Sequence, residues 1–510
     1  MLNEQINEKP ISPYGITSIG VKGFKSLKDI PFLELKPMTI LVGKNSCGKS
    51  SFLRILPLLK QSIEENIDGP LSLYGNYVDY GDFEDVLTVS KRKQKQFQFC
   101  IEGFIQNEIG PIWRVNKKYS SGNKSLKYSM SLVFKKKKNG NIYLSDIIIT
   151  LGLDISLSLK IDSTDELQKV IINKRKMDSK NIRILYSRLS RGLLPEFTLK
   201  KTSESESYYI RCSYFDIKTS NSNLDKFIHK TIDDVDLLSL QSKEQFASYM
   251  EFFYKKQDDS SVILKRKDFI SYENKIIFSL IPAIFSGINI ALSRTIYGVK
   301  YSKPIRANAE RYYRYKPLQS NEISPDGSNL AHVLSNLSEE QRNSFEDWML
   351  KKFGFKVSVE GKSLRQIIIR KGEDKHNIVD MGYGYTQILP IIVQLWLSTI
   401  RRSIARVRNN FLFAIEQPEL HLHPAMQKTL LQTFCNVISI SKYNKPRFLL
   451  ETHSKTFVML LGELIEDGVL QPDDVSILVF NNESGRESIV TQSKFNEHGD
   501  LENWPIGFFG

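Results

Sequence analysis

The sequence predicts an α/β protein whose central parallel sheet is assembled from two distant parts of the chain. Near the N-terminus, the apolar run "MTILV" (38–42) is followed by Gly43 and then by a helical pattern from Lys49. Far downstream, the segments "NFLFAIE", "RFLLET" and "VSILVFN" have the length and apolar content of buried parallel strands. A long stretch of chain separates the two groups, so we expect a split fold.

Two terminal lobes are expected to contribute to this fold. Residues 1–160 begin with the strand-like "GITSIGVKGF" and "FLELK" and alternate apolar and polar residues from position 95 onward. This pattern predicts an N-terminal lobe that contains antiparallel strands. Residues 311–510 are expected to form the C-terminal lobe, in which the helix "PAMQKTLLQTFCNVI" joins two of the buried strands.

The middle of the chain, residues 161–310, is expected to be a mostly helical insertion. Residues 163–192 and 225–300 favour helices, with a strand at "YYIRCSYFDIK" between them. The apolar run "IIFSLIPAIFSGINIAL" (276–292) contains Ser, Pro, Gly and Asn, which predicts a buried helix pair rather than a membrane span. The polar N-terminus "MLNEQINEKP" lacks the apolar segment of a signal peptide, so we expect a cytoplasmic protein without membrane contact.

The composition is that of an ordinary globular protein with a basic balance. Of 510 residues, 71 are Lys or Arg and 57 are Asp or Glu, which gives a formal net charge of +14. This excess favours an anionic partner such as nucleic acid, although a basic background is also common in AT-rich bacterial proteins. The four cysteines have no paired spacing, which argues against a zinc site and fits a reducing compartment.

The segment "GKNSCGKS", Gly43 to Ser50, matches the phosphate-binding pattern G-x-x-x-x-G-K-[ST] in full. Its glycines let successive backbone N–H groups point at phosphates, and the following helix adds its partial positive charge. We expect Lys49 to reach the terminal phosphates of ATP and the Ser50 hydroxyl to bind Mg²⁺. A chance glycine turn is the alternative, which the position between a strand and a helix disfavours. The expected nucleotide contacts are Gly43, Lys44, Asn45, Ser46, Cys47, Gly48, Lys49, Ser50 and Ser51.

Acidic residues and histidines follow the downstream strands. In "FLFAIEQPELHLHP" (411–424), Glu416 ends a strand, where an acid can hold Mg²⁺ beside the phosphates. Acidic residues in a solvent loop are the alternative, which weakens beside a complete phosphate-binding loop. The i, i+2 spacing of His421 and His423 fits a structured loop better than a metal site. His453 in "ETHSKTF" can hydrogen-bond a γ-phosphate or a water, although a lone histidine is more often structural.

The segment "DMGYGYTQILPII" (380–392) predicts a tight turn that opens a helix. Gly382 and Gly384 make the turn, and the helix end presents N–H groups and the side chains of Thr386 and Gln387 to an anion. Taken alone, the pattern favours an ordinary helix entry.

The order of these motifs resembles that of the ABC-type ATPases of the RecF/SMC kind, and more closely that of the OLD-like AAA-family ATPases of bacterial defence systems. The resemblance covers residues 15–90 and 300–510 well and the middle poorly. It implies a split ABC-type P-loop ATPase with a mixed or antiparallel β-subdomain and a helical insertion. The segments that carry it are "GFKSLKD…MTILVGKNSCGKSS", "YVDYGDFEDVL", "VDMGYGYTQILPII", "IEQPELHLHP", "ETHS" and "GDLENWPIGFF".

The resemblance implies a role for each motif. The loop of Gly43 to Ser50 corresponds to Walker A, Glu416 to the Walker B acid that holds Mg²⁺ with Ser50, and His453 to the switch histidine. In this family the signature closes over ATP that a second subunit holds, so a homodimer with ATP between its subunits is implied. The signature corresponds to Gly382, Gly384, Thr386 and Gln387.

Position 417 departs from the family pattern, because many ABC-type ATPases have a catalytic glutamate where this chain has Gln417. A neutral amide can orient the attacking water but cannot accept its proton. We expect slow hydrolysis, or another base such as Glu419 or His453, with ATP acting mainly as a clamp. The expected catalytic residues are Lys49, Glu416, Gln417 and His453.

The sequence contains no Toprim or HNH nuclease pattern, whereas full OLD nucleases carry a Toprim domain after the ATPase. We therefore expect an ATPase that is not itself a nuclease and that controls a separate one. This arrangement is similar to the Septu system, where a PtuA-type ATPase pairs with an HNH nuclease, and to retrons that use this pair. The alternative is a RecF-like repair ATPase that clamps DNA directly. Basic clusters at 91–95, 135–138, 174–176 and 265–267 are either solvated turns or contacts to nucleic acid phosphates.

Overall fold

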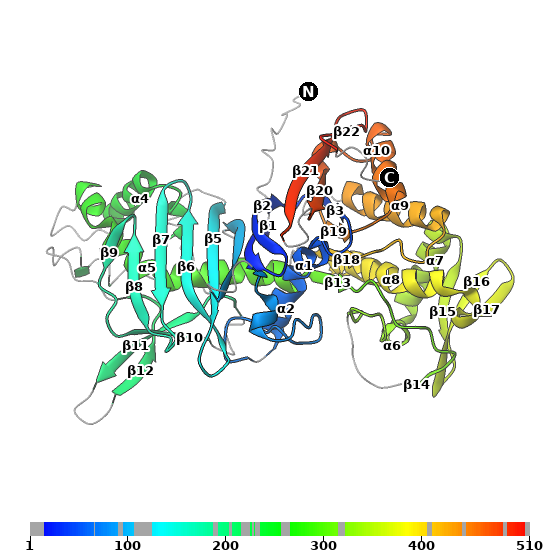
Figure 1. The fold of residues 1–510 in the computed structure, drawn as a ribbon, viewed down its shortest axis with the longest axis horizontal. Coiled ribbons are helices and arrows are strands. Elements are labelled where there is room, and N and C mark those ends of the chain that lie inside the picture. The colour runs from blue at the N-terminus through cyan, green and yellow to red at the C-terminus, as the bar shows by residue number, and fades with distance from the viewer. Residues whose placement is uncertain are drawn as a thin grey trace. The chain divides into compact units, whose positions relative to one another are not determined.

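The computed structural model describes residues 15–65, 67–89, 95–106, 125–186, 192–202, 207–215, 225–226, 229, 235–256, 266–314, 322–404, 411–440, 445–482 and 487–504. The chain forms two compact units, one from Met1–Glu34 and Leu58–Tyr297 and the other from Leu35–Pro57 and Gly298–Gly510 (Figure 1). These boundaries differ from those of the three expected segments. Of the basic clusters and the terminal motif, positions 91–94, 265 and 505–509 lie outside the described residues.

The first unit is built around an eight-stranded antiparallel sheet. Along β7, every second side chain of "ISLSLKI" is buried, which is the alternation that a sheet with one packed face requires. The strand order is β2 (Leu27–Glu34), β1 (Gly15–Phe24), β4 (Gln96–Gln106), β5 (Ser125–Lys136), β6 (Ile142–Leu151), β7 (Ile155–Ile161), β8 (Leu167–Ile172) and β9 (Arg175–Met177).

A three-stranded antiparallel sheet and several helices complete this unit. The small sheet consists of β10 (Ile182–Leu185), β11 (Glu196–Thr202) and β12 (Ser207–Arg211). The helices are α4 (Lys243–Lys256), α5 (Arg266–Tyr297) and the short η1 (Phe83–Val86) and η5 (Leu237–Ser239). The chain passes between the two units within α2 (Ile55–Glu64).

The helical prediction for residues 163–192 is wrong for the described residues 163–186, which form strands β8, β9 and β10. Asn173 and Lys174 have φ of 48° and 68° and join β8 to β9. Two left-handed residues in a row make the two-residue turn whose twist matches a β-hairpin. The sequence pair Asn-Lys is a weaker signal for this turn than Asn-Gly, so the alternation around it was the better guide.

The expected helix pair at 276–292 is instead part of a single helix, α5. Pro282 lies inside it, between Ile281 and Ile284, and both isoleucines are fully buried. Burial on both sides of the proline keeps the helix continuous against its local preference. Among the described residues, only the segment Phe269–Tyr297 is long and apolar enough to cross a membrane, and 78% of its most apolar stretch is buried, as in a core helix.

The second unit contains the parallel sheet that the sequence predicts. Strand β3 (Met38–Gly43) pairs in parallel with β19 (Arg447–Glu451) on one side and with β20 (Val475–Asn481) on the other. A strand from near the N-terminus therefore lies between two strands from the C-terminal part, which confirms the split fold. The full order is β13 (Val299–Ser302), β18 (Leu412–Glu416), β19, β3, β20, β21 (Ile489–Phe495) and β22 (Leu501–Glu502), the last two antiparallel.

Helices and a smaller sheet surround this parallel sheet. The smaller sheet contains β14 (Tyr313–Arg314), β15 (Lys356–Glu360), β16 (Leu364–Lys371) and β17 (Asp374–Asn377). The helices are α1 (Lys49–Leu53), α6 (Leu330–Ser335), α7 (Glu339–Phe353), α8 (Tyr383–Ile404), α9 (Pro424–Ile440), α10 (Lys455–Glu466), η6 (Ile378–Met381) and η7 (Pro472–Asp474).

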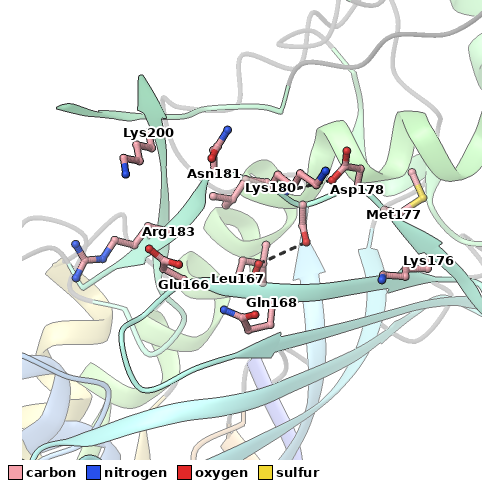
Figure 2. A pocket seen from close by; sticks show the side chains of 12 residues that line it. Glu166, Leu167, Gln168, Lys176, Met177, Asp178, Lys180, Asn181, Arg183 and Lys200 are labelled. Atoms are coloured by element: carbon pink, nitrogen blue, oxygen red, sulfur yellow. Dashed lines mark hydrogen bonds between the residues drawn. The ribbon is translucent and has the colours of Figure 1, made fainter. Parts of the chain in front are cut away.

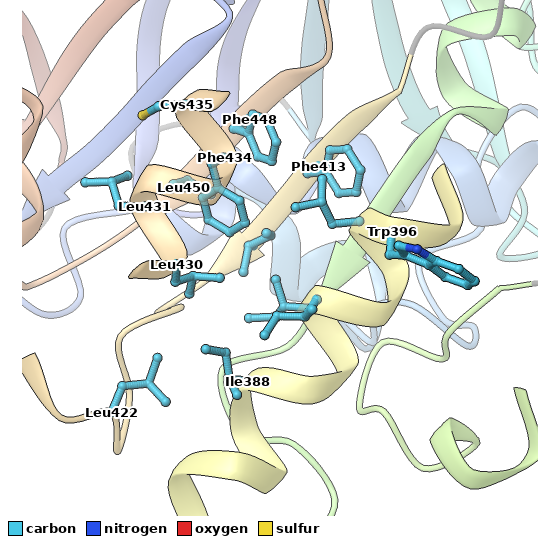
Figure 3. Close-up of a cluster of buried hydrophobic side chains, with 14 of the residues drawn as sticks. Ile388, Trp396, Phe413, Leu422, Leu430, Leu431, Phe434, Cys435, Phe448 and Leu450 are labelled. Atoms are coloured by element: carbon cyan, nitrogen blue, oxygen red, sulfur yellow. The ribbon is translucent and has the colours of Figure 1, made fainter. Parts of the chain in front are cut away.

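An aromatic cluster packs α8 and α9 onto the parallel sheet (Figure 3). The Phe448 ring of β19 stacks on Phe413 of β18, with centroids 4.9 Å apart, and on Phe434 of α9 at 4.7 Å. Trp396 of α8 is buried in the same core. Burying each of these side chains stabilises the fold by roughly 2–3 kcal/mol. The core therefore holds the carboxyl ends of β18 and β19 in fixed positions beside β3.

Candidate nucleotide-binding site

The predicted phosphate-binding loop lies between β3, which ends at Gly43, and α1, which begins after Gly48. Gly43 has a φ of 151°, and a Cβ at this position would lie 2.3 Å from the Phe480 carbonyl oxygen and 2.7 Å from Cys47 Sγ. Any side chain at position 43 would therefore displace the loop or strand β20. The glycine is required by close packing as well as by the path of the loop.

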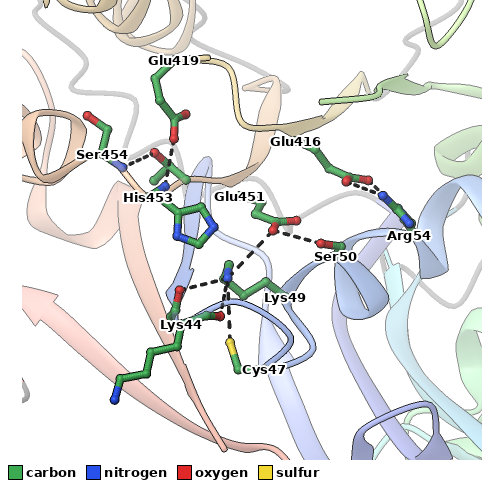
Figure 4. Close-up of polar contacts among 12 residues, drawn as sticks. Lys44, Cys47, Lys49, Ser50, Arg54, Glu416, Glu419, Glu451, His453 and Ser454 are labelled. Atoms are coloured by element: carbon green, nitrogen blue, oxygen red, sulfur yellow. Dashed lines mark hydrogen bonds and ion pairs between the residues drawn. The ribbon is translucent and has the colours of Figure 1, made fainter. Parts of the chain in front are cut away.

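The Lys49 side chain is buried inside this loop (Figure 4). Its Nζ donates hydrogen bonds to the carbonyl oxygens of Gly43, at 2.9 Å, and Lys44, at 2.8 Å. The Glu451 carboxylate lies 3.9 Å from the same nitrogen. The loop thus holds a buried ammonium group where the backbone approaches a helix start, which is an arrangement that binds phosphates.

Glu451 lies at the end of β19, the strand next to β3, and is buried. The Ser50 hydroxyl donates a 2.9 Å hydrogen bond to Glu451 Oε1. The second carboxylate oxygen of Glu451, Oε2, is buried and has no hydrogen-bond partner among the described residues. A hydroxyl and a carboxylate with a spare oxygen are donors that suit Mg²⁺, so these residues fit the expected cation.

Glu416 occupies the matching position at the end of β18, where it pairs in register with Glu451. Both of its carboxylate oxygens are engaged by Arg54, whose Nε and Nη2 each donate a 2.6 Å hydrogen bond. The Tyr301 hydroxyl donates a third, at 2.7 Å. The structure therefore places Arg54, rather than Ser50, against the acid that was expected to share Mg²⁺ with Ser50.

Sequence reasoning missed Glu451 and Arg54. Glu451 ends the apolar run "RFLLE" in the way that Glu416 ends "LFAIE", so the sequence pattern predicts its position at the carboxyl end of a strand. Its contact with Ser50 depends on the strand order, which places β19 between β18 and β3.

Burial raises the pKa of Glu451 to about 6, and the nearby charge of Glu416 adds to this shift, whereas the Ser50 hydrogen bond and Lys49 oppose it. Burial also disfavours the charged form of Arg306 and lowers its pKa to about 10, whereas the negative charges of Glu419 and Glu416 oppose this shift. Arg306 Nη2 donates to the Glu416 carbonyl oxygen at 3.2 Å. The end of β18 thus lies in a poorly solvated, charged environment.

The remaining predicted catalytic residues follow the same strand ends. The backbone N–H of His453 donates to Glu419 Oε1 at 2.8 Å, and the N–H of Gln417, which has a φ of 43°, donates to the Glu451 carbonyl oxygen at 2.8 Å. Burial, followed by the positive charge of Lys49, lowers the pKa of His453. Burial raises the pKa of Glu419. The segments that follow β18 and β19 are therefore hydrogen-bonded to each other beside the phosphate-binding loop.

The predicted glycine turn is present, since Gly382 has a φ of 83° and ends η6 immediately before α8. Gly384 lies inside the first turn of α8. Thr386 and Gln387 were expected to present their side chains to an anion, but both are buried. They belong to the face of α8 that packs inward, and Gln387 Nε2 donates to the Arg306 carbonyl oxygen at 3.5 Å.

His421 and His423 follow the sequence expectation of a structured loop. His423 Nδ1 accepts a hydrogen bond from the Ala425 N–H at 3.3 Å, at the start of α9, and the His421 ring lies 6.0 Å from that of Tyr383. No group of three or more His, Cys, Asp or Glu side chains suited to a metal ion occurs in the part of the chain that the structure describes.

Residues 15–458 match the sequence model of the AAA ATPase domain family, and the chain belongs to this family. With the split α/β sheet and the phosphate-binding loop, this defines an ATP-binding ATPase and confirms the predicted fold class. Residues 470–510 match a second model, described as a protein of unknown function (DUF3696). No curated protein matches the chain.

Two solved structures align with most of the chain at low similarity. The SMC head domain from Thermotoga maritima is 9% identical, with coverage of 94% of this chain and 98% of that one and a TM-score of 0.33. The recombination mediator protein RecF of the RecFOR pathway is 13% identical, with the same coverages and a TM-score of 0.32.

Proposed function

We propose that the chain binds ATP with Mg²⁺ on the loop from Gly43 to Ser51 and uses the nucleotide mainly to hold an assembly together. The observation that carries this proposal is the convergence of Lys49 and Ser50 on Glu451 at the carboxyl ends of the parallel strands. Ser50 and a strand-end carboxylate would hold Mg²⁺, which would supply neutralisation of the phosphate charge. The loop would orient the phosphates, and His453 and Gln417 would border the position of the attacking water.

We propose that two copies complete each other's sites, with the turn at Gly382 and Gly384 of one copy closing over ATP on the other. Mixing two defective variants tests this directly. Lys49→Ala removes the loop cation, and Gly382→Val distorts the turn, because its φ of 83° disfavours a side chain. Each variant alone should be inactive, whereas the mixture should recover activity from one intact composite site. Absence of recovery from variants that still dimerise would exclude sharing of the site.

The biological role that we propose is control of a separate nuclease, of the HNH type, in a bacterial antiviral system in the cytoplasm. Its support is the resemblance of the motif set to the ATPases of Septu and of retrons. The second candidate is a RecF-like ATPase that clamps DNA directly. It is favoured by the net charge of +14 and by a pocket of about 700 Å³ in the first unit (Figure 2). That pocket has Lys176, Lys180, Arg183 and Lys200 on its walls, beside Glu166 and Asp178.

Purification of the tagged protein from cells that carry the gene with its native neighbours separates the two roles. A stoichiometric nuclease in the purified complex, with protection against phage that requires the neighbouring gene, is expected for the first role. A lone dimer that carries only nonspecific DNA, together with sensitivity to DNA damage on deletion, would establish the second. The Lys49→Ala variant, purified in parallel, shows whether either assembly depends on ATP.

A further inference from the structure

The two strand-end acids of the second unit have unequal access to a cation. Glu416 is 1% exposed, and its two oxygens together accept three hydrogen bonds, from Arg54 and Tyr301. The guanidinium group already neutralises the negative charge, and a bidentate pair of this kind is a strong interaction. A divalent cation would have to displace Arg54 before it could bind this carboxylate.

Glu451 is also buried, but it lies nearer the phosphate-binding loop and its carboxylate is less fully hydrogen-bonded. It is on β19, which pairs directly with β3, whereas Glu416 is one strand further away, at a spacing of roughly 5 Å. Its Oε1 already accepts from the Ser50 hydroxyl, and its Oε2 has no partner among the described residues. A buried carboxylate oxygen without a partner is unfavourable unless a ligand or water satisfies it.

We propose that Glu451, and not Glu416, is the carboxylate that acts with Ser50 on the divalent cation of the bound nucleotide. Arg54 keeps Glu416 engaged, so that Glu416 is a positioning residue that fixes the end of β18. This inference rests on the proposed function, because it concerns the cation that accompanies ATP. It departs from the assignment of Mg²⁺ to Glu416 that the motif order implies.

Binding of a fluorescent ATP analogue, with Mg²⁺ or with EDTA, tests the assignment without any need for turnover. In the wild type, Mg²⁺ should increase the affinity for the analogue. Glu451→Gln should remove most of this increase while the protein still binds the analogue in EDTA, and Glu416→Gln should retain it. Glu466→Gln, an exposed acid on α10, is the matched control and should behave as the wild type.

Electron paramagnetic resonance of Mn²⁺ in the presence of nucleotide measures the cation directly. Glu451→Gln should weaken Mn²⁺ binding by about tenfold or more. Ser50→Ala should do the same, and the double variant should lose less than the sum, because both residues act on one cation. Glu451→Asp, which keeps the charge, provides a second test if the glutamine variant does not fold.

The outcomes are distinguishable. Loss of the Mg²⁺ effect in Glu416→Gln, with its retention in Glu451→Gln, would overturn the inference and return the cation to Glu416. Failure of the wild type to bind the analogue under either condition would instead refute the proposed nucleotide site.

Discussion

Glu416 and Glu451 are direct neighbours across the parallel strands β18 and β19, yet one carboxylate is bonded to a guanidinium group and the other to a serine hydroxyl. The difference follows from the sheet order, because the strand next to β3 brings its terminal acid to the phosphate-binding loop. The adjacent strand brings its acid to Arg54, one turn further along the chain from Ser50. Two chemically equivalent residues therefore have different tasks.

Removal of Arg54 should destabilise the second unit. In Arg54→Ala, the Glu416 carboxylate, with a side chain 2% exposed, loses its counter-charge and must be protonated or hydrated. We expect a loss of about 3 kcal/mol in the free energy of unfolding, measured by urea denaturation, at the low end for a buried pair because the Arg54 side chain is 35% exposed. Arg370→Ala removes a partly exposed pair with Glu360 and is the control, with an expected loss below about 1 kcal/mol. An equal loss in both variants would show that the Arg54–Glu416 pair contributes no more to the free energy of unfolding than the control pair.

The stability of the nucleotide-free protein should depend on pH through Glu451. Its folded pKa of about 6 lies above the ordinary glutamate value of 4.5, so the folded state binds the proton more tightly than the unfolded state. The free energy of unfolding should therefore fall as pH rises from 4.5 to 6, by about 2 kcal/mol from this group. Glu451→Gln should be more stable than the wild type at pH 8, and the difference should disappear near pH 4.5. A difference that is constant with pH would contradict this account.

Hydrolysis should be limited by the residue after Glu416. Gln417→Glu introduces a group that can accept the proton of water, so we expect turnover to rise by at least about tenfold. Steady-state release of phosphate measures this rate, and Lys49→Ala supplies the background. A fast wild-type turnover that Lys49→Ala abolishes and Gln417→Ala leaves unchanged would refute the role of ATP as a clamp.

Gly43 should not tolerate even a methyl group. The Cβ of Gly43→Ala would lie 2.3 Å from the Phe480 carbonyl oxygen, so strand β20 or the loop must move. We expect loss of binding of the fluorescent ATP analogue and a lower melting temperature. Gly372 has a φ of 62° but no atom within 4 Å of a Cβ, so Gly372→Ala should cost only about 1 kcal/mol and leave binding intact. Normal binding by Gly43→Ala would show that the loop adapts freely.

The sequence alone predicted the elements whose pattern lies within a few neighbouring residues. The strand, loop and helix around Gly43 to Ser50 follow from an apolar run, two glycines and a helical pattern within a few residues of one another. The end of β18 at Glu416 was equally clear. These elements need no information on distant contacts.

The features that were missed depend on contacts between distant segments. The hairpin of β8 and β9 has a turn of Asn173 and Lys174, which lacks the glycine that usually reveals such turns. The burial of Gln387 is set by the neighbouring segment at Arg306, 81 residues earlier in the chain. The contact of Glu451 with Ser50 joins residues 401 positions apart. Periodicity and spacing carry no information on such pairs.

The position of β3 between β19 and β20 also determines when the protein can fold. Met38 pairs with Phe448 and Val475, so this strand finds its neighbours only after the ribosome has synthesised most of the chain. Until then, its apolar side chains remain exposed, and contacts of such long sequence separation form slowly. We expect nascent chains that stop before Arg447 to be sensitive to protease at residues 38–43 and to be captured by chaperones. A chain stalled there with β3 already protected would show that the strand has another partner during synthesis.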